Sequence, residues 1–188
     1  MTPVFYLQKI WQGPGPVLCW KARRQEEGGE RQNGYLVVSA VQNAPPVAFV
    51  TEKVADLSGG VTLQNLLRKH AGSAVLGAVV RSKTGDLLVP LRPGRGQPAR
   101  LWIWYVKGRP AALRLITEDT ILAEQSEKSA KTKKRALDEG FWESWADAEE
   151  VSLAASDSPP ANVEEKRATI VSSAQRTLFG RESRHETR

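Results

Sequence analysis

Residues 100–116 read RLWIWYVKGRPAALRLI, and this stretch decides the fold class. Two apolar runs rich in aromatic and aliphatic residues flank the turn signal Lys107-Gly108. Because side chains alternate along a strand, Trp102 and Trp104 share one face of the first run. The pattern predicts an antiparallel hairpin. It does not decide whether the face with the two Trp side chains is buried in the core or exposed at the surface.

Short apolar runs bounded by Gly, Pro and Asn precede this hairpin, as is typical of strands. Residues 74–92 form a second hairpin pattern across the turn SKTGD, in which Pro90 argues for an edge or bulged strand. A single helix pattern, VTLQNLLRKHAG, interrupts the strands and ends on basic residues and Gly. Residues 1–116 are therefore predicted to form an α+β domain, mainly an antiparallel sheet or small barrel with one helix.

The character of the chain changes at residue 117. Residues 117–155 are strongly charged, and Glu124 and Lys128 are spaced like an i,i+4 helix pair. We interpret this segment as an exposed helix or a charged linker that carries an aromatic patch, FWESW. The patch either folds back on the sheet or docks on a partner, and the first is favoured. Residues 156–188 are rich in Ser, Pro and charge, which predicts a disordered tail.

Charge is distributed unevenly along the 188 residues, which carry a net charge of +6. Residues 1–116 hold 16 Lys and Arg against 6 Asp and Glu, whereas residues 117–188 hold 11 against 15. The start of the chain lacks the pattern of a signal peptide, and no apolar run approaches the roughly 20 residues that span a bilayer. We expect a cytoplasmic protein without a membrane partner and with a basic first domain.

The basic residues concentrate between residues 81 and 114, and three of the predicted turns there carry positive charge. Arginine outnumbers lysine, and its guanidinium forms forked bonds to phosphate and stacks on bases. Outward-facing Trp beside basic loops would form a stacking platform for single-stranded nucleic acid. The candidate nucleic-acid-binding residues are Arg81, Lys83, Arg92, Arg95, Arg100, Trp102, Trp104, Lys107 and Arg109.

Catalytic patterns are missing from the sequence. It has no Gly-rich phosphate loop and no GxSxG elbow, and its single cysteine, Cys19, has no nearby His in the sequence. One Cys with His70 and His185 does not make a usual zinc site. We therefore predict no catalytic residues, no cofactor and no metal, and favour a non-enzymatic protein; a nuclease that uses only carboxylates and a metal stays open.

The tail contains Gln175-Arg176-Thr177-Leu178-Phe179, which has the form Q-x-x-L-F. This resembles the pentapeptide by which many bacterial polymerases and repair proteins dock on the β sliding clamp. The resemblance implies that Gln175 is the polar anchor and that Leu178 and Phe179 fill the pockets. Arg176 departs from the family, where Leu is frequent at this position. The resemblance covers five residues and implies nothing about the folded domain.

These observations lead to one functional hypothesis with two alternatives. The first is a non-enzymatic accessory protein of DNA replication, repair or a mobile genetic element. Its basic domain holds single-stranded DNA or RNA, and its tail docks on the clamp. The second is an RNA-binding subunit of a ribonucleoprotein complex, and the third is the metal-dependent nuclease. The sequence does not separate DNA from RNA as the ligand.

Overall fold

The computed structural model describes residues 2–52, 62–71 and 73–153. These residues form one antiparallel sheet of 13 strands, one α-helix and one short 3-10 helix. The elements are β1 (Val4–Gln12), β2 (Val17–Gln25), β3 (Arg31–Ser39), β4 (Val47–Val50), α1 (Thr62–Ala71), β5 (Ala74–Leu76), β6 (Val80–Arg81), β7 (Leu87–Pro93), β8 (Ala99–Val106), β9 (Arg109–Ile116), β10 (Thr120–Gln125), β11 (Ala130–Lys131), β12 (Arg135–Ala136), η1 (Glu143–Trp145) and β13 (Glu149–Glu150).

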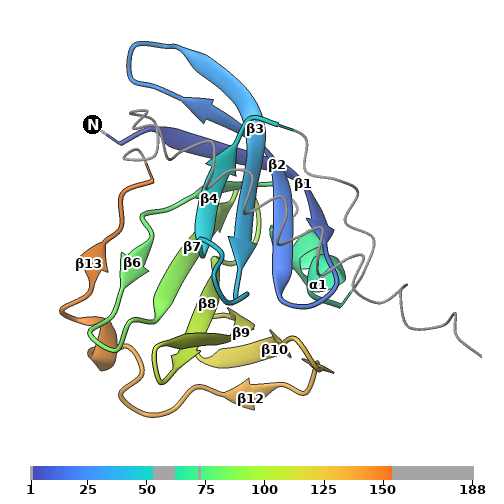
Figure 1. Cartoon of the computed structure of the whole chain (residues 1–188), viewed down its shortest axis with the longest axis vertical. Coiled ribbons are helices and arrows are strands. Elements are labelled where there is room, and N and C mark those ends of the chain that lie inside the picture. The colour runs from blue at the N-terminus through green and yellow to red at the C-terminus, as the bar shows by residue number, and fades with distance from the viewer. Residues whose placement is uncertain (1, 53–61, 72, 154–188) are drawn as a thin grey trace, which may run out of the picture.

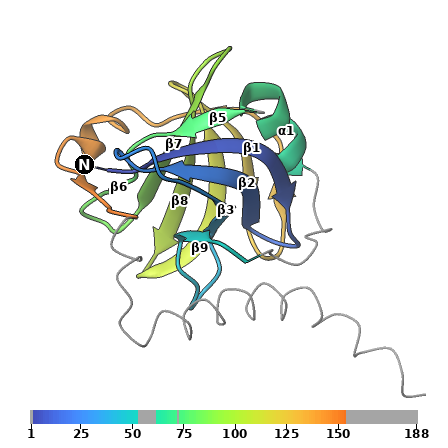
Figure 2. The same cartoon turned by 90° about the horizontal axis from the view of Figure 1, so that it is seen from above.

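The sheet is open rather than a closed barrel. Its strands follow the order β11-β10-β9-β8-β7-β5-β1-β2-β3-β4, with β12 on β10, β6 on β7 and β13 on β6. The sheet nevertheless curls strongly, as Figure 2 shows. Gln12 at the end of β1 donates from Nε2 to Oε1 of Gln125 at the end of β10, over 3.2 Å, although these strands are not neighbours. The curl therefore brings the ends of distant strands together.

Helix α1 lies at the margin of this curl (Figures 1 and 2) and packs against β1, β7 and β10. Its first turn is tied to β1 by two hydrogen bonds, because the backbone N–H of Gln64 donates to Gln12 Oε1 (3.1 Å) and that of Gln12 donates to Gln64 Oε1 (3.0 Å). One of the unpaired N–H groups at the helix start is thus satisfied by another strand. Leu63 and Leu67, which are one helical turn apart, are buried at 1% and 0% exposure.

The main core lies on the concave face of the sheet. Leu101 and Ile103 of β8 are fully buried there, together with Trp20 of β2 and the helix leucines. Burying side chains of this size contributes roughly 1.5–3 kcal/mol each. The prediction of a mainly antiparallel sheet with one helix is therefore confirmed. Of the two predicted forms, an open sheet or a small barrel, the structure has the open sheet.

Pro90 lies inside the sheet rather than at its edge. Strand β7 pairs with β8 along one side, including Pro90 with Arg100. Its other side is shared by β5 and β6, which stop short of Pro90 and leave only a hydrogen bond from Gly77 N to the Pro90 carbonyl (2.9 Å). A residue without an N–H is tolerated there because the neighbouring ladder is interrupted.

The helix or linker expected after residue 117 is not what the structure has. Residues 120–125 form strand β10, which pairs with β9 and continues the sheet beyond residue 116. Ile121 and Ala123 are buried at 6% and 1% exposure, so tertiary burial outweighs the local charge pattern. Glu124 bonds to arginines of neighbouring strands rather than to Lys128. The disordered tail predicted for residues 156–188 lies outside the described residues.

Strand β3 is closely approached by β4 at Gly34. A Cβ atom there would lie 2.5 Å from the carbonyl oxygen of Val50 and 2.6 Å from a ring carbon of Phe49. We expect Gly34→Ala to lower the free energy of unfolding by about 1–3 kcal/mol, because the backbone and the ring must shift. Urea denaturation measures this. Gly28→Ala is the control, since no atom lies within 4 Å of its Cβ position; equal stabilities of the two variants would contradict the prediction.

Candidate nucleic-acid interface

Trp102 and Trp104 lie on the convex, outer face of β8. Residues of this strand alternate between full burial and partial exposure, and both Trp side chains take the partly exposed positions. The same alternation sends Leu101 and Ile103 to the core, at 0% exposure. The position that the sequence left open is thus decided, and the Trp pair is outside the main core.

Trp102 is held in place by contacts with three other parts of the protein. Its indole Nε1 donates to Asp86 Oδ2 (3.1 Å), and the other carboxylate oxygen accepts from the backbone N–H of Tyr105 (2.9 Å). Its ring lies 4.9 Å from that of Phe141, between centroids. The guanidinium carbon of Arg114 lies 4.5 Å from the ring centroid. Trp102 therefore joins the β6–β7 turn, the aromatic patch and β9.

Arg114 links both Trp rings to β10. Its guanidinium carbon lies 3.9 Å from the centroid of Trp104, within cation–π range. Its Nε donates to Glu124 Oε2 over 2.5 Å, and the same oxygen accepts from Nη2 of Arg135 over 3.3 Å. Arg114 is only 7% exposed and the Glu124 side chain 15%, so the contact between these two residues is largely desolvated. Trp104 is half-buried like Trp102, but among the described residues its indole has only the contact with Arg114 and no hydrogen bond or aromatic partner.

The aromatic patch folds back on the sheet, as the favoured interpretation predicts. Residues 138–151 run along the outer face beside β6 and β7, and η1 lies in this run (Figure 1). Trp142 donates from Nε1 to the carbonyl oxygen of Glu118 (2.6 Å), and the guanidinium carbon of Arg100 lies 4.4 Å from its ring centroid. We call residues 138–151 the acidic segment, because it carries six exposed carboxylates, the last two of them in β13: Asp138, Glu139, Glu143, Asp147, Glu149 and Glu150.

The acidic segment engages several of the predicted nucleic-acid-binding residues. Lys83 forms an exposed ion pair with Asp147, at 2.9 Å between Nζ and Oδ2. Arg81 pairs in register with Glu149, and Arg100 stacks on Trp142. Lys83, Arg100 and Trp102 are thus in contact with the chain's own acidic and aromatic groups, and Arg81 lies opposite an acidic residue on a paired strand.

The remaining nucleic-acid-binding candidates do not gather on one side of the sheet. Lys107 and Arg109 lie at the β8–β9 turn, at the same end of the sheet as Lys83, because β7 starts where β8 ends. Arg95 lies in the β7–β8 turn at the opposite end, where a Cβ at Gly96 would lie 3.8 Å from the carbonyl oxygen of His70. Arg92 is exposed on the outer face and lines a separate pocket.

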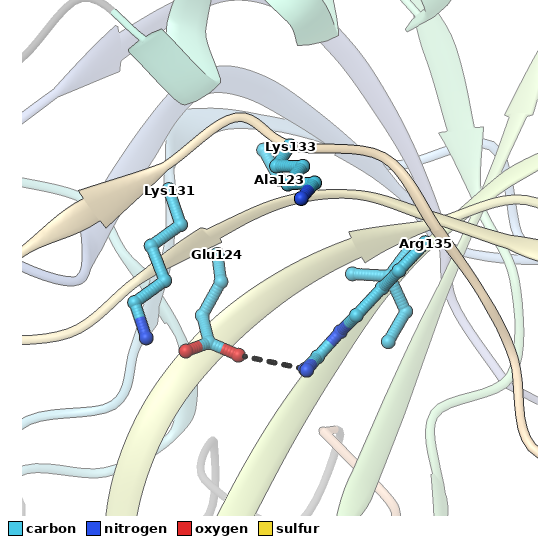
Figure 3. A pocket seen from close by; sticks show the side chains of 6 residues that line it. Ala123, Glu124, Lys131, Lys133 and Arg135 are labelled. Carbon is cyan, nitrogen blue, oxygen red and sulfur yellow. Dashed lines mark hydrogen bonds and ion pairs between the residues drawn. The ribbon is translucent and has the colours of Figure 1, made fainter.

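A second basic group, absent from the sequence-based candidates, lies at the β10 edge. Lys131, Lys133 and Arg135 line a pocket of about 310 Å³ with Ile121, Ala123 and Glu124 (Figure 3). The signal in the sequence is the run KTKKR at residues 131–135, a short basic run of the kind that contacts nucleic acid. The net charge of residues 117–188 does not reveal this run, because acidic residues on either side of it outnumber the basic ones.

Other kinds of site find little support in the described residues. Nowhere in that part of the chain do three or more His, Cys, Asp or Glu side chains gather closely enough to hold a metal ion. Burial raises the pKa of the Cys19 thiol to about 12, so it stays protonated and unreactive at neutral pH. None of the described helices has the length and apolar composition needed to cross a membrane.

Comparisons with known proteins found no match among family models, curated proteins or solved structures.

Proposed function

We propose that this protein is a non-enzymatic nucleic-acid-binding accessory protein that holds single-stranded DNA or RNA, mainly through phosphates. The observation that carries the proposal is the grouping of a partly exposed Trp104 with exposed cations that the acidic segment leaves unengaged. We call this group the aromatic-basic surface; its members are Trp104, Lys107, Arg109, Lys131, Lys133 and Arg135.

The contacts around this surface favour a single strand as the ligand. Trp104 is connected to the β10 edge through Arg114 and Glu124, so the aromatic ring and the cations lie on one continuous part of the sheet, from β8 to β11 and β12. Aromatic stacking contributes about 1–3 kcal/mol for each base and tolerates any sequence, and exposed cations add contacts to phosphates. A ligand with accessible bases and a charged backbone uses both kinds of group.

The binding test is the salt dependence of affinity for labelled single strands. Fluorescence anisotropy with oligothymidylate should give an affinity that falls steeply between about 50 and 200 mM NaCl. Each phosphate contact releases counterions and so adds about −0.7 to the slope of the logarithm of the binding constant against the logarithm of the salt concentration. The matched measurement uses oligouridylate. Much tighter binding of the RNA would favour the ribonucleoprotein alternative, and an affinity that does not respond to salt would contradict nucleic-acid binding through phosphates.

We further propose that Leu178 and Phe179, with Gln175, dock the protein on the β sliding clamp. The proposal rests on the resemblance of the motif alone, since these residues lie outside the described part of the chain. Burying both apolar side chains in a cleft would supply roughly 3–5 kcal/mol before ordering costs. This magnitude suits weak, reversible docking that delivers the basic domain to DNA.

A clamp pull-down tests this docking separately from nucleic-acid binding. We expect the full chain to retain a purified bacterial β clamp and the double substitution Leu178→Ala and Phe179→Ala to lose it. The control replaces another apolar pair of the same tail, Ile170→Ala and Val171→Ala, and should bind like the wild type. Equal retention by both double variants would show that the motif does not dock.

A further inference from the structure

The pocket at the β10 edge arises from an interruption in the sheet. Strand β10 pairs with β11 through Glu124 and Lys131, and with β12 through Ile121 and Arg135. Between these two pairs the chain from residue 132 to 134 leaves the ladder, and the pocket opens beside β10. Figure 3 shows Lys131 and Arg135 reaching toward Glu124 from opposite sides. We call this pocket the β10 cleft.

The charge of the β10 cleft is positive despite its carboxylate. Glu124 Oε2 already accepts hydrogen bonds from the buried Arg114 and from Arg135, so two guanidinium groups compensate one negative charge. Lys131 and Lys133 are exposed and form no ion pair within the described residues. The cleft is lined by three cations and one compensated carboxylate, so its net positive charge attracts anions.

The cationic groups are of two complementary kinds. The Arg135 side chain is 57% exposed, and its Nη2 donates a hydrogen bond to Glu124. The other N–H groups of its planar guanidinium remain as donors for an anion. The two lysines act as mobile point charges at the same opening. A tetrahedral phosphate accepts bonds from several directions at once, so it can use the fork and the ammonium groups together.

We propose that the β10 cleft binds a backbone phosphate of the nucleic acid, with Lys131, Lys133 and Arg135 as its contacts. The inference rests on the proposed function and names a subsite of it. Trp104 of β8 and the cleft beyond β10 are two to three strands apart, about 10–15 Å at the usual strand spacing. Strands β8, β9 and β10 are neighbours in the sheet, so one extended strand of nucleic acid can cross them and reach both groups.

The test compares two double variants that remove the same charge. Lys131→Gln with Lys133→Gln should weaken oligothymidylate binding by about tenfold and lower the salt slope by roughly 1, as expected for one or two lost phosphate contacts. Lys21→Gln with Arg31→Gln, exposed on β2 and β3, should change affinity less than about twofold, because nonspecific long-range attraction is screened by salt. Thermal unfolding of both variants should match the wild type.

A second measurement uses the wild-type chain, so it does not depend on how a variant folds. Lysine acetylation read by mass spectrometry should show that oligothymidylate protects Lys131 and Lys133 but not Lys21. If the wild type binds nucleic acid and neither protection nor weakening is seen, the cleft proposal is overturned while the proposed function stands. If the wild type binds no nucleic acid, both fail. If the protein binds phosphatidylserine vesicles and not the oligonucleotide, the cleft is assigned to lipid phosphate. This result would also overturn the proposal that the cleft binds a nucleic-acid phosphate.

Discussion

Replacing Arg114 by alanine is expected to lower the free energy of unfolding by about 3–5 kcal/mol, because it strips a desolvated carboxylate of its closest partner. The side chains of Arg114 and Glu124 are 9% and 15% exposed. After the change Glu124 keeps only the longer and more exposed contact with Arg135. The cation–π contacts that hold Trp102 and Trp104 disappear at the same time.

A double-mutant cycle measures how much of this loss belongs to the ion pair. Arg114→Ala, Glu124→Ala and the combined variant are compared by urea denaturation. The combined variant should be less destabilised than the sum of the two single changes. Each single change leaves an unpaired buried charge, whereas the combined variant leaves none. Replacing both residues by methionine should restore most of the stability, since the apolar side chains fill the space. A loss below about 1 kcal/mol for Arg114→Ala would show that the pair is effectively solvated.

Replacing Trp104 by alanine is expected to weaken oligothymidylate binding by about 5- to 150-fold, the equivalent of one lost base stack of 1–3 kcal/mol. Trp104 is the Trp of β8 whose ring is not enclosed by the acidic segment. Trp104→Phe should keep most of the affinity, because any aromatic face can stack on a base. The effect should persist at high salt, unlike the loss from removing a lysine.

The matched control for this change is Trp11→Ala. Trp11 is also partly exposed, stacks near a cation (Lys9, 5.3 Å from its ring centroid) and lies on β1, in the other half of the sheet. Its removal should alter affinity less than about twofold, since no base stack is lost there. Equal binding by both alanine variants and the wild type would remove Trp104 from the interface.

The acidic segment reduces the number of basic residues that are available to nucleic acid, and no local pattern in the sequence indicates this. In the sequence, Arg81 and Lys83 belong to a basic region, whereas Glu149 and Asp147 lie more than 60 residues later in an acidic one. Folding joins Lys83 to Asp147 in an ion pair and sets Arg81 opposite Glu149 on paired strands, so the charges of the two regions partly cancel on one face of the sheet. The face that stays cationic is the one toward β10.

Local patterns determined the elements that depend on neighbours in the chain. The hairpin of residues 100–116 follows from two apolar runs around Lys107-Gly108, and helix α1 follows from the spacing of Leu63 and Leu67. Alternation along β8 also determined that the Trp pair shares a face. Each of these needs only the geometry of a single strand, turn or helix.

Only the tertiary structure decided which face of β8 is buried, that residues 120–125 are a strand, and where the basic run 131–135 lies. A strand with Leu, Ile, Trp and Tyr on alternating positions is apolar on both faces, so its burial depends on what packs against it. The charges of β10 favour a helix locally, but pairing with β9 and burial of Ile121 and Ala123 outweigh that preference. Such long-range pairing and burial depend on residues far apart in the chain, and no local window of sequence contains them.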